Sequence, residues 1–337
     1  MTPDQQPLAR EIARLAELDV VALGMPAAMT RRGEHLDTAW PKGTQQFNDL
    51  PRWLAGGGSA DEAQLLLIFT AAGAEQRAIG GDVVPLDEPE LLSITTERKL
   101  RTISLVPMPT DPNAVRHLDR TGMAELVTFV PSFMHSSVGA TLIDMLETFE
   151  DTRLLSVHQR CGAAQGGLGA RLFDAMHSVQ RLLGAPETID AMLAGTRGRR
   201  SHSLATLTGS LSANLRFAHG ACATLSLSDA GGSWFRGLLA TGSGGTIRAF
   251  DGGIVRTDVE GKIIDESKPE ASELTTSLDA AVHAIASELR RILDPAGRRT
   301  PPIERRQVLA MCEAAMLSAR TGQPESPATI LKMSLSA

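Results

Sequence analysis

Residues 166–186 read GGLGARLFDAMHSVQRLLGAP, and this stretch limits the choice of fold more than any other. Two glycines open it, and apolar residues then recur at the spacing of one helical face: Leu172, Met176, Val179 and Leu183. Gly184 and Pro186 are typical residues beyond a helix end. The pattern predicts a helix over 170–183, entered through a glycine-rich loop from a buried strand over 154–159.

Helical and strand-like segments alternate ahead of this stretch. A helix is expected almost from the first residue, with Thr2 as its cap and Pro3 in its first turn. Buried strands are then expected over 20–23, 64–70, 102–106 and 126–130, and helices over 48–54, 90–101, 113–118 and 138–149. This alternation is typical of an α/β layer built on a parallel sheet.

The sequence beyond residue 200 has a different pattern. Short apolar strands are separated by turn signals such as His219-Gly220 and Glu260-Gly261. Two amphipathic helices follow. Their apolar stripes consist of Leu278, Val282, Ile285, Leu289 and Ile292 in the first, and of Val308, Cys312, Ala315 and Ala319 in the second. A large, mostly antiparallel sheet closed by two helices is therefore expected in the second half.

Composition limits the class of protein as well. The chain has 337 residues, 42% apolar and 21% charged, with a net charge of −6, which fits a two-domain globular protein without a nucleic-acid footprint. The sequence has no run of eighteen apolar residues, so we expect no membrane span. It has no charged segment followed by an apolar one at its start, so we expect no signal peptide. Cys161, Cys222 and Cys312 lack disulfide or metal-ligand spacing, so no metal is expected and a reducing cytoplasm fits best. Tyrosine is absent, which excludes any mechanism that uses a tyrosine acid.

Four segments of the second half resemble the Gfo/Idh/MocA family of oxidoreductases, named after glucose–fructose oxidoreductase and inositol dehydrogenase. The first is the glycine-glycine loop with its helix and the Leu-Leu-Gly-Ala-Pro exit at 182–186. The others are Phe-Ala-His-Gly-Ala at 217–221, Leu-Leu-Ala-Thr-Gly-Ser-Gly-Gly-Thr-Ile at 238–247 and Ser-Ala-Arg-Thr-Gly-Gln-Pro at 318–324. Their order and spacing carry the resemblance, while residues 8–150 fit more loosely.

The resemblance implies a fold and an activity. It predicts an α/β protein with a truncated Rossmann-like domain over 1–150 and a C-terminal α+β domain over 151–337, whose last helices are able to pack back on the first domain. The large, mostly antiparallel open sheet of the second domain often mediates oligomers in this family. The resemblance also implies NAD(P) as cofactor and the oxidation of a sugar-like alcohol.

The residues that the family uses for this chemistry are replaced or missing in the sequence. No strand and no glycine turn for the cofactor's diphosphate precede the first helix, and Met25 stands where a carboxylate would hold the ribose. Met108, between two prolines, stands where the resemblance places a lysine. Ala170 and Asp174 stand where it places an aspartate and a histidine that acts as general base. We therefore expect a degenerate member of the family that binds no cofactor.

Three residues remain as candidates for a site. His177 lies one turn beyond Asp174, and both share the polar face of their helix with Arg181. We interpret this face as an exposed surface with weak pairing along the helix, in preference to a displaced general base. His135, in the segment Met134-His135-Ser136, is a candidate for the substrate pocket, although no orienting acid is apparent.

Three functions are compatible with these observations. The first is a non-catalytic partner, or pseudoenzyme, that assembles with itself or with an active family member through its C-terminal sheet. The second is an active NAD(P)-dependent oxidoreductase of a sugar-like or cyclic alcohol with a modified cofactor site. The third is a redox-neutral enzyme or small-ligand binder with His135, Asp174 or His177 as polar anchors. We rank them in this order, with no nucleic acid and no membrane among the expected partners.

Overall fold

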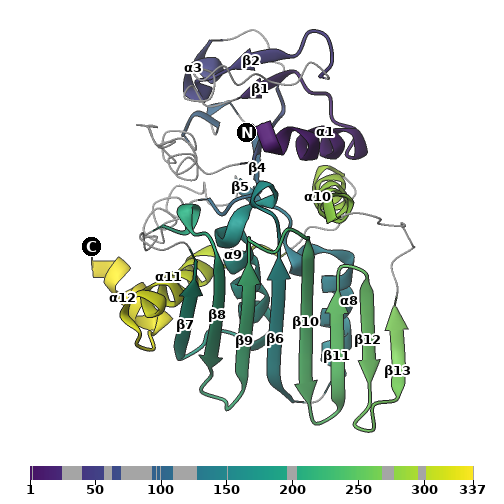
Figure 1. Ribbon diagram of the computed structural model, residues 1–337, viewed down its shortest axis with the longest axis vertical. Helices are drawn as coiled ribbons and strands as arrows, with labels where there is room; N and C mark the ends of the chain where they lie inside the picture. The colour runs from purple at the N-terminus through teal and green to yellow at the C-terminus, as the bar shows by residue number, and fades with distance from the viewer. Residues whose placement is uncertain are drawn as a thin grey trace.

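The computed structural model describes residues 1, 3–24, 40–56, 63–69, 93–95, 97–98, 100–108, 127–149, 151–195, 203–267, 277–294 and 301–336. Short parallel strands with their helices form one end of the molecule, and a wide sheet forms the other (Figure 1). Thr2, Met25 and the segment over 113–118 lie outside the described residues, as do residues 90–92, 96 and 99 of the segment over 90–101, so the predictions that rest on them stay untested. None of the helices in the described part is long and apolar enough to cross a membrane.

Short parallel strands organise the first half. Its helices are η1 (Pro3–Gln5), α1 (Gln6–Leu15) and α3 (Leu50–Ala55), and its strands are β1 (Ala22–Gly24), β2 (Gln45–Phe47), β3 (Leu65–Ile68), β4 (Arg101–Ser104) and β5 (Val127–Phe129). β1 pairs with β2, while β3, β4 and β5 form a second sheet in that order, and all of these pairings are parallel. The predicted α/β layer on parallel strands is confirmed.

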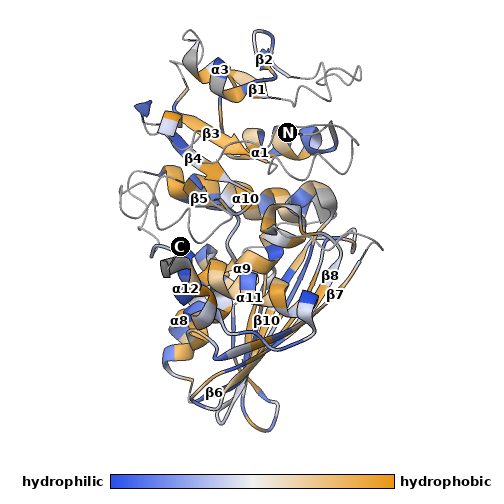
Figure 2. Cartoon of the chain, turned by 90° about the vertical axis from the view of Figure 1, so that its left-hand side faces the viewer, coloured by the Kyte–Doolittle hydropathy of each residue, from blue (hydrophilic) through white to orange (hydrophobic). Residues whose placement is uncertain are grey.

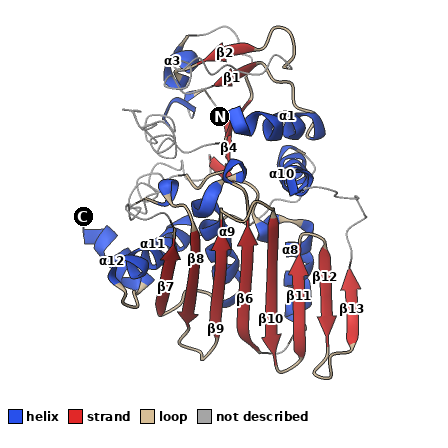
Figure 3. Ribbon diagram, viewed as in Figure 1, coloured by secondary structure: helices blue, strands red, loops and turns tan. Residues whose placement is uncertain are grey.

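An eight-stranded sheet forms most of the second half (Figure 3). Its strands are β6 (Thr152–Arg160), β7 (Thr188–Ala194), β8 (Ser210–Arg216), β9 (Cys222–Ser228), β10 (Phe235–Gly242), β11 (Gly245–Phe250), β12 (Gly253–Thr257) and β13 (Ile263–Ser267). Their order is β13-β12-β11-β10-β6-β9-β8-β7, and only β6 and β9 pair in parallel. The expected large and mostly antiparallel sheet is therefore confirmed.

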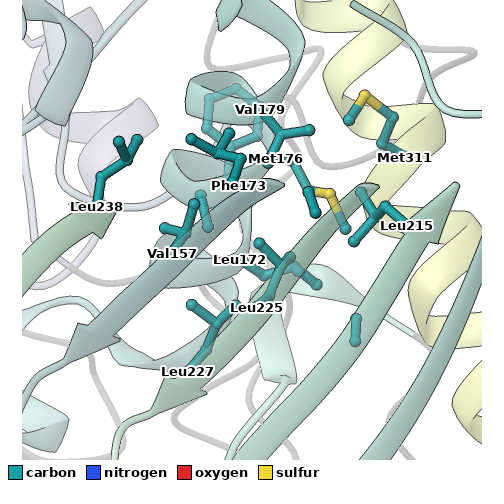
Figure 4. Packing of buried hydrophobic residues seen from close by; sticks show 14 of the residues in the cluster. Val157, Leu172, Phe173, Met176, Val179, Leu215, Leu225, Leu227, Leu238 and Met311 are labelled. Carbon is teal, nitrogen blue, oxygen red and sulfur yellow. The ribbon is translucent and has the colours of Figure 1, made fainter. Parts of the chain in front are cut away.

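Helices cover one face of this sheet (Figure 2). They are α8 (Ser137–Glu147), α9 (Gly167–Leu183) and α11 (Arg305–Thr321), and α12 (Pro327–Ser336) packs against α11. Neighbouring side chains of a strand point to opposite faces, so alternate residues of the strands from β10 to β7 are buried under the helices, whereas every residue of β13 is exposed. In Figure 4, Val157 and Leu225 of the strands lie near Leu172 of α9, and Leu238 and Met176 belong to the same buried cluster. This cluster is the main core of the second half.

Glycines shape the entry to α9. Gly166 and Gly167 have φ angles of 110° and 71°, in the left-handed region that favours glycine. A Cβ atom on Gly169 would collide with the carbonyl oxygen of Leu204 in η6 (Leu204–Thr206), so this position needs glycine for close approach. The helix begins three residues before the predicted start at Ala170 because the glycine-rich loop itself enters the first turn.

Helix α10 (Ser277–Leu293) joins the two halves of the chain. It follows the eight-stranded sheet in the sequence but packs against α1 in space (Figure 1). Leu8 and Ile12 of α1 share a buried cluster with Val282 and Ile285 of α10. Burying an apolar side chain of this size contributes about 1.5–3 kcal/mol, so this contact holds α10 on the first half. The expected domain boundary near residue 150 remains a prediction.

Candidate active site

The loop after β5 lies at the carboxyl end of the parallel sheet, where ligands bind in open α/β folds. It begins with a cis peptide bond between Val130 and Pro131 and ends in the short helix η4 (Phe133–His135). We call residues 130–135 the η4 loop. Side chains from α9, α10 and β10 form hydrogen bonds with the backbone of this loop, so the two halves of the chain meet here in polar interactions.

Glu288 connects α10 to the η4 loop. The residue is 4% exposed, and its Oε2 accepts a hydrogen bond from the backbone N–H of Ser132 at 2.8 Å. Its other oxygen, Oε1, lies 3.5 Å from Nδ1 of His135 and 3.8 Å from Nη2 of Arg291. A buried carboxylate needs such donors and cations because burial alone disfavours its charge. Among the described residues Oε1 has no hydrogen-bond partner, so Glu288 is an acid close to His135 that the sequence around His135 does not supply.

His177 is buried beside the same loop. Its Nδ1 lies 3.0 Å from Oγ of Ser132, and its ring meets the ring of His135 edge to face, with 5.1 Å between the centroids. Burial, followed by the charges of His135 and Arg181, lowers the pKa of His177 to about 3, so the ring is neutral near pH 7. The interpretation of His177 as an exposed residue is wrong. It is 3% exposed because the η4 loop packs on this side of α9.

Asp174 is also buried, with 0% exposure, so the interpretation as an exposed residue is wrong for it as well. Its Oδ1 accepts a hydrogen bond from the backbone N–H of Phe133 at 2.7 Å. Its Oδ2 lies 3.6 Å from Nη1 of Arg236 and 3.9 Å from Nη1 of Arg171. Of the predicted polar face, Arg181 alone is exposed. Asp174 thus binds the η4 loop rather than solvent.

Arg236 on β10 is held by several groups. Its Nε and Nη2 donate to Oδ1 of Asp251 at 3.1 and 2.8 Å, and its Nη1 donates to the carbonyl oxygen of Pro131 at 3.3 Å. Burial alone would lower the pKa of Arg236, but the carboxylates of Asp251 and Asp174 outweigh burial and raise the pKa. Trp234 also donates from Nε1 to Asp251 at 2.9 Å. Arg236 is therefore a fixed, charged group beside the loop.

Arg171 differs from Arg236 in its contacts. It is 0% exposed, and its guanidinium carbon lies 4.6 Å from the ring centroid of Trp234. Within the described residues, none of its three side-chain nitrogens has a hydrogen-bond partner. Burial lowers the pKa of Arg171 against the opposing effects of Cys161 and Asp174. A buried guanidinium without hydrogen bonds destabilises the fold.

The structure brings the three candidates from the sequence, His135, Asp174 and His177, together around the η4 loop. Three further residues of this site were not among the sequence candidates: Ser132, Glu288 and Arg236. Among the described residues there is no group of three or more His, Cys, Asp or Glu side chains that could hold a metal ion. The arrangement offers a histidine with a buried carboxylate, which is suited to proton transfer.

Residues 3–5, which form η1 just ahead of α1, do not favour a diphosphate. They include Pro3, which has no N–H, and Asp4, whose charge would repel a diphosphate. At the carboxyl ends of β3 and β4, Phe69 and Leu105 are buried in one apolar cluster with Trp234.

No family model and no curated protein sequence matches the chain. Solved structures share its fold over almost the whole length. An oxidoreductase from Agrobacterium radiobacter, in complex with NAD+, L-tartaric acid and magnesium, is 15% identical, with a TM-score of 0.61 over 96% of both chains. A myo-inositol dehydrogenase from Corynebacterium glutamicum is 16% identical, with a TM-score of 0.58 over 95% of both chains. A levoglucosan dehydrogenase in complex with NADH and levoglucosan is 11% identical, with a TM-score of 0.59 over 95% of both chains.

These structures confirm the fold that the resemblance implied, with a Rossmann-type half and a half built on a large sheet. They correct the expectation that no cofactor is bound. Two of the three were crystallised with NAD+ or NADH, which points to a nucleotide cofactor for this fold rather than to none. Loss of hydride transfer has no support in these structures.

Proposed function

We propose that the chain is an NAD(P)-dependent oxidoreductase of a sugar-like or cyclic alcohol, with a cofactor site that departs from the usual Rossmann arrangement. One observation carries the proposal: Glu288, buried, lies 3.5 Å from Nδ1 of His135 at the carboxyl end of the parallel sheet. A carboxylate–histidine pair at this edge is suited to take a proton from a bound alcohol. The substrate class is supported by the myo-inositol and levoglucosan dehydrogenases that share the fold.

Oxidation of a secondary alcohol removes a proton from the hydroxyl group and a hydride from the same carbon. His135 takes the proton on Nε2, because its Nδ1 faces Glu288. The carboxylate of Glu288 keeps the ring oriented and stabilises the imidazolium that forms. The oxidant is, by chemical class, a nicotinamide dinucleotide.

Fluorescence titration of the purified full chain with NADH and with NADPH tests the cofactor. We expect a dissociation constant below about 1 mM for one of them. A panel of inositols, aldoses and anhydrosugars with NAD+ and NADP+ then tests turnover through the absorbance of the reduced cofactor. Binding of neither dinucleotide would contradict the proposal.

A matched pair of variants tests the role of His135. We expect His135→Gln to lower kcat by about 100-fold, since general-base catalysis contributes at least that much. His158→Gln is the control, because His158 is exposed on β6, away from the η4 loop. Equal activity of the two variants would contradict the assignment of His135.

A non-catalytic partner is the second candidate function. Within the described residues no helix packs on the outer face of the eight-stranded sheet, where Leu239 of β10 is 37% exposed and Met192 of β7 is 76% exposed. We propose that this face binds a second copy of the chain or an active protein of the same fold. Light scattering tests self-association: we expect a dimer or larger species that Leu239→Arg weakens, and a monomer at all concentrations would contradict self-association.

We also propose a cytoplasmic location. The cysteines Cys161, Cys222 and Cys312 are all unpaired, as is usual in a reducing compartment. Fractionation of producing cells tests this, and recovery of the chain outside the cytoplasm would contradict it.

A further inference from the structure

Two charged side chains of the second half bind the backbone of the η4 loop. Asp174 of α9 accepts the N–H of Phe133 at 2.7 Å, and Arg236 of β10 donates to the carbonyl oxygen of Pro131 at 3.3 Å. The two side chains also contact each other, with 3.6 Å between Oδ2 of Asp174 and Nη1 of Arg236. Both are buried, where charge-assisted hydrogen bonds are stronger than in water.

A further layer fixes this pair in place. Asp251 accepts from Nε and Nη2 of Arg236 at 3.1 and 2.8 Å, and it accepts from Nε1 of Trp234 at 2.9 Å. The ring centroid of Trp234 lies 5.3 Å from the guanidinium carbon of Arg236. A guanidinium held by a carboxylate and packed against a ring has few alternative positions, so Arg236 gives the loop a rigid support.

The supported segment leads directly to His135. β5 ends at Phe129, so the N–H of Phe133 is beyond the strand ladder and depends on Asp174 for its hydrogen bond. His135 follows two residues later, with 3.5 Å between its Nδ1 and Oε1 of Glu288. A displacement of about 1 Å at such a site can cost about 100-fold in rate. The position of His135 therefore depends on groups that do not touch it.

We infer that Asp174 and Arg236 are positioning residues, which hold the η4 loop so that His135 faces Glu288. The inference rests on the proposed function of His135 as proton acceptor. Asp174 is not itself placed to meet a substrate, because it is fully buried and its Oδ1 already binds Phe133. The resemblance places a general base at the position of Asp174. In this protein Asp174 supports the η4 loop instead.

Two substitutions of Asp174 separate its hydrogen bond from its charge. Asp174→Ala removes the acceptor for Phe133, whereas Asp174→Asn keeps an acceptor oxygen and removes the charge. Asp190→Asn is the control, because Asp190 is exposed on β7. In histidine-labelled protein, the NOE between the rings of His135 and His177, whose centroids are 5.1 Å apart, reports the position of the loop. We expect the NOE in the parent and in Asp190→Asn, at least part of it in Asp174→Asn, and its loss in Asp174→Ala.

Kinetics give the second readout. We expect Asp174→Ala to lower kcat by about 100-fold with KM changed less than about 3-fold, and Asp174→Asn to recover part of the loss. An unchanged NOE together with unchanged kcat in folded Asp174→Ala would overturn the inference. If Asp174→Ala does not fold, Arg236→Lys serves in its place, because lysine keeps the charge and loses the paired contact with Asp251. If the parent protein has no turnover, the proposed function fails, while the NOE still decides whether Asp174 positions His135.

Discussion

The Oε1 atom of Glu288 lies 3.5 Å from Nδ1 of His135, although Glu288 belongs to a helix that follows the whole eight-stranded sheet in the sequence. Glutamine at this position would still accept the N–H of Ser132 but would carry no charge. We expect Glu288→Gln to lower kcat by about 100-fold with little change in KM, because the imidazolium of His135 loses its counter-charge. Steady-state kinetics measure this, with the exposed Glu187→Gln as control. An unchanged kcat would show that Glu288 only supports the fold.

Burial of His177 makes the stability of the protein depend on pH. Its pKa is about 3 in the folded chain, below the ordinary value of 6.5. Between these values the unfolded chain binds more protons, so the free energy of unfolding falls as the pH falls from about 6.5 toward 3. At pH 4 the free energy of unfolding should be about 3 kcal/mol lower than at pH 7 because of His177. His177→Gln should remove this pH dependence. Urea denaturation at several pH values measures it, and the same pH dependence in His177→Gln as in the exposed control His158→Gln would contradict the prediction.

The two buried arginines should respond in opposite ways to removal. Arg171 has no hydrogen-bond partner among the described residues, so we expect Arg171→Met to leave the free energy of unfolding unchanged or to raise it by about 1–3 kcal/mol. Arg236→Met leaves Asp251 without its partner and should lower the free energy of unfolding by about 3–5 kcal/mol. Chemical denaturation measures both. A large loss of stability in Arg171→Met would reveal a stabilising contact of its guanidinium.

Gly139 in α8 allows the helix to approach the η4 loop. A Cβ atom there would collide with the carbonyl oxygen of Phe133 and would lie 2.7 Å from Cα of Met134. We expect Gly139→Ala to lower the free energy of unfolding by about 1–3 kcal/mol and to reduce activity, because the loop must move. Thermal and chemical denaturation measure the first effect. The control is Gly56→Ala, whose new methyl group would be no nearer than 3.4 Å to another atom, and a similar loss in both variants would refute the steric argument.

The three thiols should differ in reactivity. Burial raises the pKa of Cys161 and of Cys312, whereas Cys222 is exposed. We expect a thiol reagent such as DTNB to modify one cysteine of the native protein quickly and the other two only after denaturation. Mass spectrometry of the labelled peptides identifies the site. Rapid labelling of Cys161 in the folded protein would mean that the cluster around Trp234 opens.

Periodicity and apolar runs predicted many elements of the fold, but they predicted no strand at β2 or β7 and no helix at α12. The runs over 64–70 and 126–130 contain β3 and β5, and the turn signals beyond residue 200 separate the antiparallel strands. The burial of Asp174 and His177 could not be predicted in this way. A helical pattern identifies a polar face but not what covers it, and every residue of α9 from Leu168 to Val179 is buried because the sheet and the η4 loop pack on different sides.

The positions of Glu288 and Arg236 in the sequence did indicate that their side chains are buried. Glu288 lies beside Leu289 on the apolar stripe of α10, and Arg236 shares the inward side of β10 with Leu238. A charge at such a position indicates burial with a partner. The partner itself could not be predicted, because the contact of Glu288 with Ser132 spans 156 residues and no local pattern carries information over that length.

The packing of α10 on α1 has a consequence for synthesis. Leu8 and Ile12 leave the ribosome long before Val282 and Ile285, the residues that cover them in the finished protein. Until then the apolar side of the first helix lacks the cover that α10 gives it. A chain terminated just before Ser277 would still contain every strand of the wide sheet, yet its first helix would permanently lack the cover of Val282 and Ile285.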